Sequence, residues 1–171
     1  GIVGPNTRDE IMKDLGIEIE NTNVISCYNE DDIRDRIAKN AKALAGSKYV
    51  LGEERLGATD CSGTVFYSYN EAGVEVPRLT AQGYHNIMKK IKKEDIQPGD
   101  IITYSNINQN NRVTHVQVYI GTAEDRKGIT VNDAVINAGS TATGVYIVSL
   151  EEYLSWSATS HLIPHYGTLL P

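Results

Sequence analysis

The stretch Thr59-Asp60-Cys61-Ser62-Gly63 places a cysteine directly after residues that favour the start of a helix. Thr59 and Asp60 are good N-cap residues, so Cys61 is predicted to occupy the first helical turn. Backbone N–H groups in that turn lack intrahelical partners and the helix dipole is positive there, which favours a thiolate. A thiolate is the attacking species in cysteine catalysis, and the same N–H groups suit an oxyanion. The alternative is a buried cysteine that packs as a small apolar side chain, which is the commoner fate of a single cysteine.

Helical patterns come first along the chain and strand patterns follow. Apolar residues at helical spacing come after Asp31-Asp32, and Gly46 is expected to end that helix. After the turn residues Gln97-Pro98-Gly99-Asp100, the pattern changes to strands. The expected helices cover 31–44, 60–71, 80–90 and 151–154, and the expected strands cover 101–104, 113–120, 134–137, 145–150 and 161–166. Helices followed by a run of strands predict an α+β fold.

Two polar residues in expected strands are candidates to act with Cys61. The strand 113–120 alternates, with His115, Gln117 and Tyr119 on one face and Val116, Val118 and Ile120 on the other. Asn137 interrupts an apolar strand, and its amide oxygen is suited to accept the proton on the far nitrogen of His115. The alternatives are a hydrogen-bonded core histidine and an asparagine at a strand end. Spacing alone does not show that His115 reaches Cys61.

Composition excludes several classes of protein. The chain has 171 residues, with 16 basic and 22 acidic residues and a net charge of −6. Its one basic run, 89–93, is short, so nucleic-acid binding is not expected. No stretch approaches the roughly 18 apolar residues of a membrane-spanning helix. The two cysteines, Cys27 and Cys61, exclude a disulfide scaffold and a four-cysteine zinc site. A single bridge is possible, but a nucleophilic Cys61 must be a free thiol.

The first part of the chain differs from the rest. Residues 1–30 are rich in polar and turn-forming residues, and we expect a linker or extension with a short helix around 8–15. Residues 31–171 are expected to form one compact domain. The opening Gly1-Ile2-Val3-Gly4 lacks the charged and apolar regions of a signal peptide.

Five segments resemble the motifs of NlpC-type cell-wall cysteine peptidases, in the order that this family has them. The segments are Asp60-Cys61-Ser62-Gly63, Val76-Pro77-Arg78-Leu79-Thr80-Ala81-Gln82, Gln97-Pro98-Gly99-Asp100-Ile101, His115-Val116-Gln117-Val118-Tyr119-Ile120-Gly121 and Ile136-Asn137-Ala138. The resemblance extends over about 45–150. It implies a papain-like α+β fold, in which N-terminal helices pack on an antiparallel sheet of about five to six strands.

The chain departs from the family pattern in four places. Leu51 and Glu53 stand where the family usually has Trp and a second Gly. Gln117 replaces the Gly of the histidine strand, and Asn137 replaces the commoner third His. About fourteen extra residues, 122–135, separate the two strands that carry His115 and Asn137, and they predict a longer hairpin.

The resemblance also implies a reaction and a set of site residues. Cys61 would attack an amide through a thioester, His115 would move the proton, and Asn137 would orient His115. The implied substrate is the peptide stem of peptidoglycan, cut next to D-Glu or in a cross-bridge. The implied substrate-binding residues are Tyr49, Asp60, Ser62 and Arg78, the first three around a free N-terminal amine and Arg78 at a substrate carboxylate or a surface acid. No metal or cofactor is required, because a Cys–His pair activates itself.

Two other interpretations stay open on the sequence. One keeps the fold but changes the thioester chemistry, to an amidase, a transglutaminase-like enzyme or an acyltransferase. The other is a non-catalytic wall-binding module, for which an activated thiol has no use. The substrate class implies a secreted, wall-associated or phage-associated protein.

Overall fold

The computed structural model describes residues 29–171, so the expected linker at 1–30, its helix and Cys27 lie outside the described residues apart from 29 and 30. Four α-helices are described: α2 (Glu30–Ala43), α3 (Cys61–Asn70), α4 (Ala81–Ile87) and α5 (Leu150–Thr159). Two short 3-10 turns, η1 (Lys93–Asp95) and η2 (Ile107–Gln109), flank the first long strand. The three N-terminal helices precede the main sheet, as the sequence pattern predicts.

The main sheet has six strands, all paired antiparallel, in the spatial order β4-β9-β5-β6-β7-β8. Its strands are β4 (Lys89–Lys90), β5 (Ile101–Asn106), β6 (Arg112–Glu124), β7 (Thr130–Ser140), β8 (Gly144–Ser149) and β9 (Leu162–Thr168). A second, small sheet precedes α3 and consists of β1 (Lys48–Tyr49), β2 (Glu54–Arg55) and β3 (Ala58–Thr59). The architecture is therefore α+β, with the expected antiparallel sheet.

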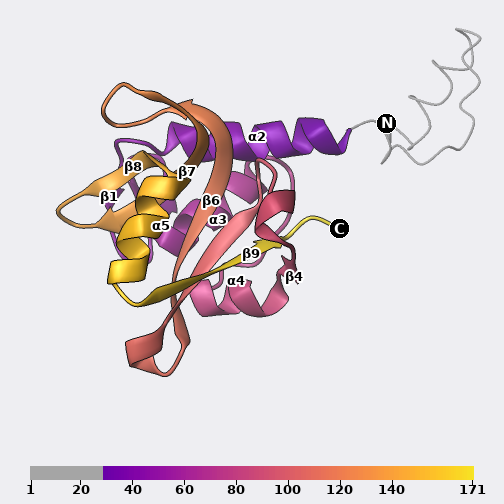
Figure 1. Ribbon diagram of the computed structural model, residues 1–171. Helices are drawn as coiled ribbons and strands as arrows, with labels where there is room; N and C mark the ends of the chain where they lie inside the picture. Colours follow the sequence, from indigo (N-terminus) through magenta and orange to yellow (C-terminus); the bar gives the residue numbers. More distant parts are fainter. Residues whose placement is uncertain (1–28) are drawn as a thin grey trace, which may run out of the picture.

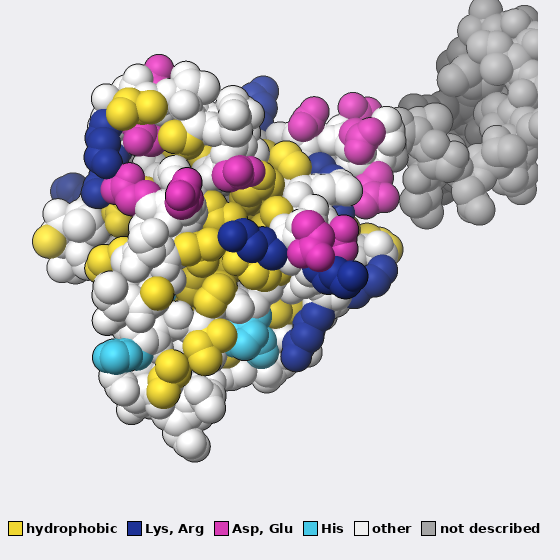
Figure 2. All heavy atoms as spheres, in the orientation of Figure 1, with side chains coloured by type: hydrophobic (Ala, Val, Ile, Leu, Met, Phe, Trp, Pro, Cys, Tyr) yellow, Lys and Arg dark blue, Asp and Glu magenta, His cyan; other side chains and the backbone are white. Residues whose placement is uncertain are grey.

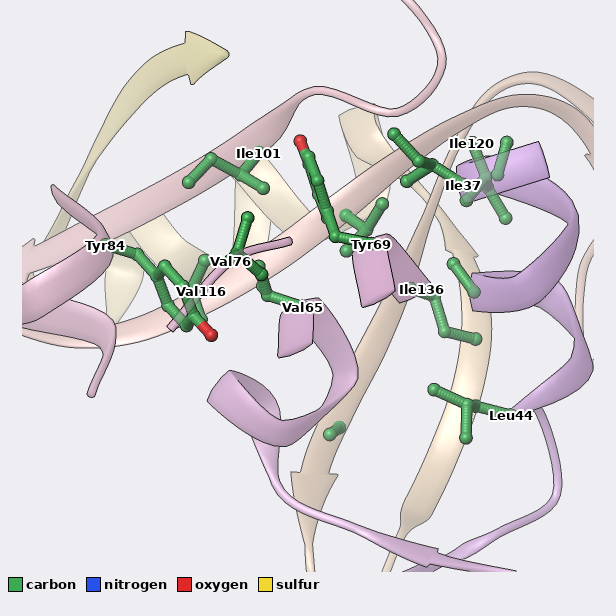
Figure 3. Close-up of a cluster of buried hydrophobic side chains, with 14 of the residues drawn as sticks. Ile37, Leu44, Val65, Tyr69, Val76, Tyr84, Ile101, Val116, Ile120 and Ile136 are labelled. Atoms are coloured by element: carbon green, nitrogen blue, oxygen red, sulfur yellow. The ribbon is translucent and has the colours of Figure 1, made fainter. Parts of the chain in front are cut away.

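The sheet separates two apolar layers. Side chains of α2, α3 and α4 pack on one face, where Val116, Val118 and Ile120 of β6 meet Ile37 and Val65 of the helices (Figure 3). On the other face, α5 packs on β7, β8 and β9 and lies at the front of the view in Figure 1. The alternation of β6 thus divides its side chains between two cores.

Aromatic side chains gather on the α5 face of the sheet. Tyr104 and Tyr119 of the sheet pack there with Tyr153 of α5, and His115 stacks on Tyr153 with the ring centroids 5.9 Å apart. The strand face predicted to carry His115 is therefore the face that α5 covers.

Several elements differ from the sequence-based expectation. The short strands β1, β2 and β3 are not among the expected strands, and β7 is longer than the expected strand 134–137. The helix expected at 80–90 ends at Ile87, and Lys89–Lys90 instead forms the edge strand β4 against β9. Met88 explains the early end, because its side chain is buried and lies against Gly167 of β9, where an added Cβ would be 2.6 Å from the Met88 sulfur. Contact with the sheet overrides helical propensity at this point. The helix expected at 151–154 runs on as α5, with Ser149 as its N-cap.

The extra residues 122–135 form the longer hairpin that the sequence predicts. Strands β6 and β7 stay paired from Val118–Ile136 out to Glu124–Thr130, with two irregularities in register. On the N-terminal side of Val118, β6 and β7 are no longer paired. The two strands therefore separate at the level of His115 and Asn137. Backbone and side-chain groups of both strands can contact other parts of the chain there.

Charges are spread over the surface. On the face shown in Figure 2, the Lys and Arg side chains of the described residues lie in small groups between acidic and uncharged ones (Figure 2). Within residues 29–171, no helix is long and apolar enough to cross a bilayer.

Gly63, in the first turn of α3, is required by close packing. An added Cβ would lie 2.1 Å from the backbone oxygen of Glu53 and 2.7 Å from Thr59 Oγ1. Because a backbone oxygen cannot move aside cheaply, Gly63→Ala is expected to lower the free energy of unfolding by about 3 kcal/mol. Urea denaturation measures this change.

Gly83→Ala is the matched control, since Gly83 is also helical. Its added Cβ would lie 2.9 Å from Leu79 Cβ and no closer than 3.4 Å to any other atom beyond its chain neighbours and the helix backbone, which is a milder contact than the 2.1 Å approach at Gly63. The expected loss is below about 1 kcal/mol, because Ala also has the higher helix propensity. Equal losses in the two variants would contradict the close-packing explanation.

Candidate active site

Cys61 is the first residue of α3, as the capping pattern predicts. Asp60 is the N-cap, and its Oδ1 accepts the backbone N–H of Gly63 at 2.6 Å. Cys61 is a half-buried, free thiol. The thiol therefore lies among the unpaired N–H groups at a helix start.

The strand that carries His115 passes directly beside this thiol. The backbone N–H of Val116, the next residue along β6, lies within hydrogen-bonding reach of the Cys61 sulfur. That N–H is on the part of β6 that β7 does not pair. The separation of the two strands thus creates the place in which helix α3 presents Cys61 to β6.

His115 and Asn137 are bonded to each other. The His115 Nε2 atom lies 2.7 Å from Asn137 Oδ1, across the gap between β6 and β7. The hydrogen-bonding partner that the sequence suggests for the histidine is therefore in reach. This bond leaves Nδ1 of His115 as the ring nitrogen available for chemistry.

Two further residues continue this hydrogen-bonded chain. Gln117 donates its Nε2–H to the same Asn137 Oδ1 at 2.7 Å, and Tyr104 donates its hydroxyl to Gln117 Oε1 at 2.7 Å. Tyr104 and Gln117 are both fully buried. The chain Tyr104–Gln117–Asn137–His115 crosses the three adjacent strands β5, β6 and β7 (Figure 1).

The shifts in pKa of Cys61 and His115 both favour the neutral form of the side chain. Burial raises the pKa of Cys61, and the charge of Asp60 raises it further, while the N–H groups of Val116 and Ser62 lower it without offsetting the rise. Burial lowers the pKa of His115 below its ordinary 6.5, although the bond to Asn137 acts in the opposite direction. The expectation that the helix start lowers the thiol pKa is wrong in its direction, because desolvation outweighs the helix N–H groups.

Alkylation of Cys61 is therefore expected to be slow at neutral pH and to accelerate past the ordinary thiol pKa of 9.0. Only the thiolate reacts, and its fraction stays small below the raised pKa. The measurement is the rate of iodoacetamide modification at each cysteine across neutral and alkaline pH, by mass spectrometry. The Cys61→Ser variant gives the rate of Cys27 alone. A Cys61 titration midpoint below the ordinary value would contradict the stated electrostatics.

The other four residues named from the sequence lie beside Cys61. A cleft of about 700 Å³ is lined by Tyr49, Asp60, Cys61, Ser62 and Arg78, among others. The structure thus brings these residues to one side of the thiol.

Within this cleft, both carboxylate oxygens of Asp60 already accept hydrogen bonds. Its two carboxylate oxygens accept bonds from Ser62 Oγ, from Arg78 Nη2 and from the N–H groups of Gly52 and Gly63. Burial alone would raise the pKa of Asp60, but these hydrogen bonds and Arg78 lower it. Arg78 also donates to Ser62 Oγ at 2.7 Å. Arg78 Nε also pairs with Glu54 Oε2 at 3.2 Å, so the guanidinium lies between the carboxylates of Asp60 and Glu54. In this structure Arg78 therefore pairs with a surface acid, one of the two partners that the sequence leaves open.

Metal-ligating residues do not cluster in the described part of the chain, where no group of three or more His, Cys, Asp or Glu side chains is arranged to hold an ion.

Comparison with known proteins places this geometry in a family. The family model described as the NlpC/P60 family matches residues 46–160 of the chain. The chain belongs to the NlpC/P60 family. That range contains Cys61, His115 and Asn137.

Individual relatives agree with this assignment. The chain is 30% identical over 118 residues to the bifunctional muramidase/DL-endopeptidase CwlT of Bacillus subtilis, covering 68% of this chain and 35% of CwlT. It is 31% identical over 115 residues to the probable peptidoglycan endopeptidase LytE of the same organism, covering 67% of this chain and 29% of LytE. The chain thus spans about a third of each relative's length.

A solved structure confirms the fold. NlpC1 from Trichomonas vaginalis superposes with a TM-score of 0.62 at 26% identity, covering 84% of this chain and 45% of NlpC1. The fold is therefore the papain-like α+β fold of NlpC/P60 proteins.

The sequence did not identify as site residues three side chains that surround His115 and Asn137. Tyr153 of α5 stacks on His115, and Tyr104 lies 5.9 Å from the same ring. Gln117 bonds Asn137. The one available signal was Gln117 itself, a polar residue in the histidine strand where the family has Gly. Nothing in local sequence marks Tyr104 or Tyr153, because their neighbours come from other elements.

Proposed function

We propose that this domain is a cysteine endopeptidase that hydrolyses amide bonds in the peptide stems of peptidoglycan. One arrangement carries the proposal. The Cys61 thiol, at the start of α3, lies beside the strand that carries His115, and His115 is hydrogen-bonded to Asn137. Membership of the NlpC/P60 family and the names of CwlT and LytE support the substrate class.

The proposed reaction begins with proton transfer inside a neutral pair. His115 Nδ1 removes the thiol proton as the Cys61 sulfur attacks the amide carbonyl carbon, and the C–S bond forms. Backbone N–H groups at the start of α3 stabilise the developing oxyanion. His115 then gives its proton to the amide nitrogen, the C–N bond breaks and the amine leaves. Water, deprotonated by His115, hydrolyses the thioester and restores the thiol.

The two sides of the scissile bond are proposed to occupy different cavities. Cys61 lines the cleft of Tyr49 and Arg78, which therefore receives the acyl side. His115 lines a second cavity of about 430 Å³, beneath α5, together with Tyr153. Because His115 protonates the departing amine, this second cavity lies on the leaving side.

The acyl-side residues are proposed to act as a preformed polar wall. Tyr49 is half-buried and close enough to Cys61 and Asp60 for their charges to raise its pKa, after burial as the largest cause. Asp60 holds Ser62 and Arg78 in place, and an incoming ammonium would share its oxygens with Arg78. We propose that Tyr49 and Ser62 contact the N-terminal part of the stem and that Arg78 contacts a carboxylate.

Digestion of purified peptidoglycan tests the proposal. Walls of several chemistries are incubated with the chain, and the fragments are identified by mass spectrometry. We expect new free amines and carboxyls at one stem bond, next to D-Glu as the name DL-endopeptidase of CwlT suggests. Fragments joined to an added amine would instead identify an acyltransferase, and unchanged walls would contradict the proposed hydrolysis.

The domain is further proposed to begin near residue 31 and to act outside the cytoplasm, in the wall or on a phage particle. The proposed start is supported by α2, whose Ile37 and Ala41 belong to the core, and the proposed location by the substrate class.

A further inference from the structure

The orientation of the Asn137 amide determines where the proton of the His115 ring lies. An asparagine amide has an acceptor oxygen and a donor nitrogen of nearly equal size, and rotation by a half-turn about Cβ–Cγ exchanges them. If the nitrogen faced His115 Nε2, it would donate to that atom and place the ring proton on Nδ1. The proposed mechanism needs Nδ1 to be bare, so the orientation of the Asn137 amide decides whether His115 can act as a base.

The structure contains a second donor aimed at the Asn137 oxygen. Gln117 Nε2 lies 2.7 Å from Asn137 Oδ1, the same atom that lies 2.7 Å from His115 Nε2. The half-turned amide would bring its own donor nitrogen against the donor of Gln117. Two buried N–H groups facing each other are strongly unfavourable, so Gln117 disfavours the wrong orientation.

Gln117 has the same ambiguity, and Tyr104 resolves it. A hydroxyl can accept as well as donate, but among the described residues the buried Tyr104 O–H has Gln117 Oε1 as its only acceptor, at 2.7 Å. A turned Gln117 would leave that O–H without an acceptor, so Gln117 Nε2 is held facing Asn137. Tyr104 and Gln117 are both fully buried, so water does not compete for these groups. Each amide orientation in the chain is therefore set by the residue before it.

We propose that Gln117 and Tyr104 are positioning residues, which lock the Asn137 amide so that His115 carries its proton on Nε2 and keeps Nδ1 free. This inference rests on the proposed function for its catalytic consequence. It also connects two departures from the family pattern, because Gln117, in place of Gly, donates a hydrogen bond to Asn137, in place of His.

The first test is spectroscopic and needs no substrate. The nitrogen-15 chemical shifts of the His115 ring distinguish the two neutral tautomers in the intact chain. We expect the wild type to show Nε2–H and a bare Nδ1. Gln117→Met, an apolar variant of similar shape, is expected to populate the Nδ1–H tautomer. An unchanged tautomer in Gln117→Met would overturn the proposal.

The second test measures turnover on purified walls. Gln117→Met is expected to lower kcat about tenfold, the equivalent of one net hydrogen bond, with KM little changed. Tyr104→Phe should cause a smaller loss in the same direction. The matched control is Tyr119→Phe, since the Tyr119 hydroxyl is bonded to Asp133 at 2.8 Å and takes no part in the chain. A loss in the control equal to that in Tyr104→Phe would indicate a general packing effect and overturn the assignment.

Two combined variants keep the test decisive. Gln117→Met alone leaves the buried Tyr104 hydroxyl unpaired, whereas Gln117→Met with Tyr104→Phe removes both polar groups and is expected to fold normally. The double variant should keep the lowered kcat of Gln117→Met, although its Tm should be higher than that of Gln117→Met. In an Asn137→Ala background, Gln117→Met should cost nothing further, because no amide at position 137 remains for Gln117 to hold. The same tenfold loss in that background would overturn the lock.

The outcomes separate this inference from the proposed function. Absence of any Cys61-dependent wall cleavage would contradict the function while leaving the tautomer measurement interpretable. A normal tautomer in Gln117→Met, with wall cleavage present, would contradict the lock alone.

Discussion

Cys61→Ser is expected to abolish wall cleavage, with a loss of at least about a thousandfold, and to leave the fold intact. A hydroxyl has a far higher pKa than a thiol, so the neutral His115 cannot generate a comparable nucleophile from serine. The two side chains are almost equal in shape, and Cys61 is only half-buried. Clearing of a suspension of purified walls measures the activity, and circular dichroism with the Tm measures the fold.

Cys27→Ser is the control for this experiment. Cys27 lies outside the described residues, and Cys61 is a free thiol, so removing Cys27 is expected to leave wall cleavage unchanged. Cleavage that persists in Cys61→Ser, or that disappears in Cys27→Ser, would be incompatible with Cys61 as the nucleophile.

His115→Ala is expected to produce a loss comparable to that of Cys61→Ser, and a larger one than any change at Asn137. In the proposed mechanism His115 moves the proton in both halves of the reaction, whereas Asn137 holds the ring through the 2.7 Å bond to its Nε2. The expected order of turnover is wild type, Asn137→His, Asn137→Ala and then His115→Ala. Asn137→Ala should retain activity at roughly a hundredth of the wild-type level.

The same variants are distinguished by their pH profiles. The pKa of His115 is lowered by burial, so the acid limb of kcat/KM for the wild type should lie below pH 6.5. The bond to Asn137 raises this pKa, so Asn137→Ala should move the acid limb to still lower pH. Asn137→Ala with wild-type turnover, or an acid limb that moves upward, would show that another acceptor holds the imidazole.

The raised pKa of Cys61 has a consequence for selectivity in the proposed mechanism. A cysteine with a raised pKa reacts slowly with small electrophiles, and in this mechanism it becomes nucleophilic when His115 accepts its proton during attack. We expect such a site to discriminate between a substrate held in the cleft and an electrophile that meets the thiol by collision.

Local sequence determined the helices and the long strands of this fold, but not the short strands β1 to β4. The start of α3 followed from Asp60, because an N-cap acts over three residues and needs no tertiary partner. The two faces of β6 followed from strict alternation, and the long hairpin at 122–135 followed from the spacing between two strands. The resemblance to NlpC-type peptidases, carried by five short segments, then selected Cys61, His115 and Asn137.

Tertiary structure decided what these residues can do. Met88 ends α4 early because it packs on Gly167, a residue far along the chain. The pKa of Cys61 is raised because desolvation depends on everything packed around α3, whereas the helix dipole is visible in local sequence. The His115–Asn137 bond forms because β6 and β7 separate beyond Val118, which no periodicity encodes. A hydrogen bond requires agreement within a few tenths of an ångström between side chains on different strands, and only the packed sheet provides it.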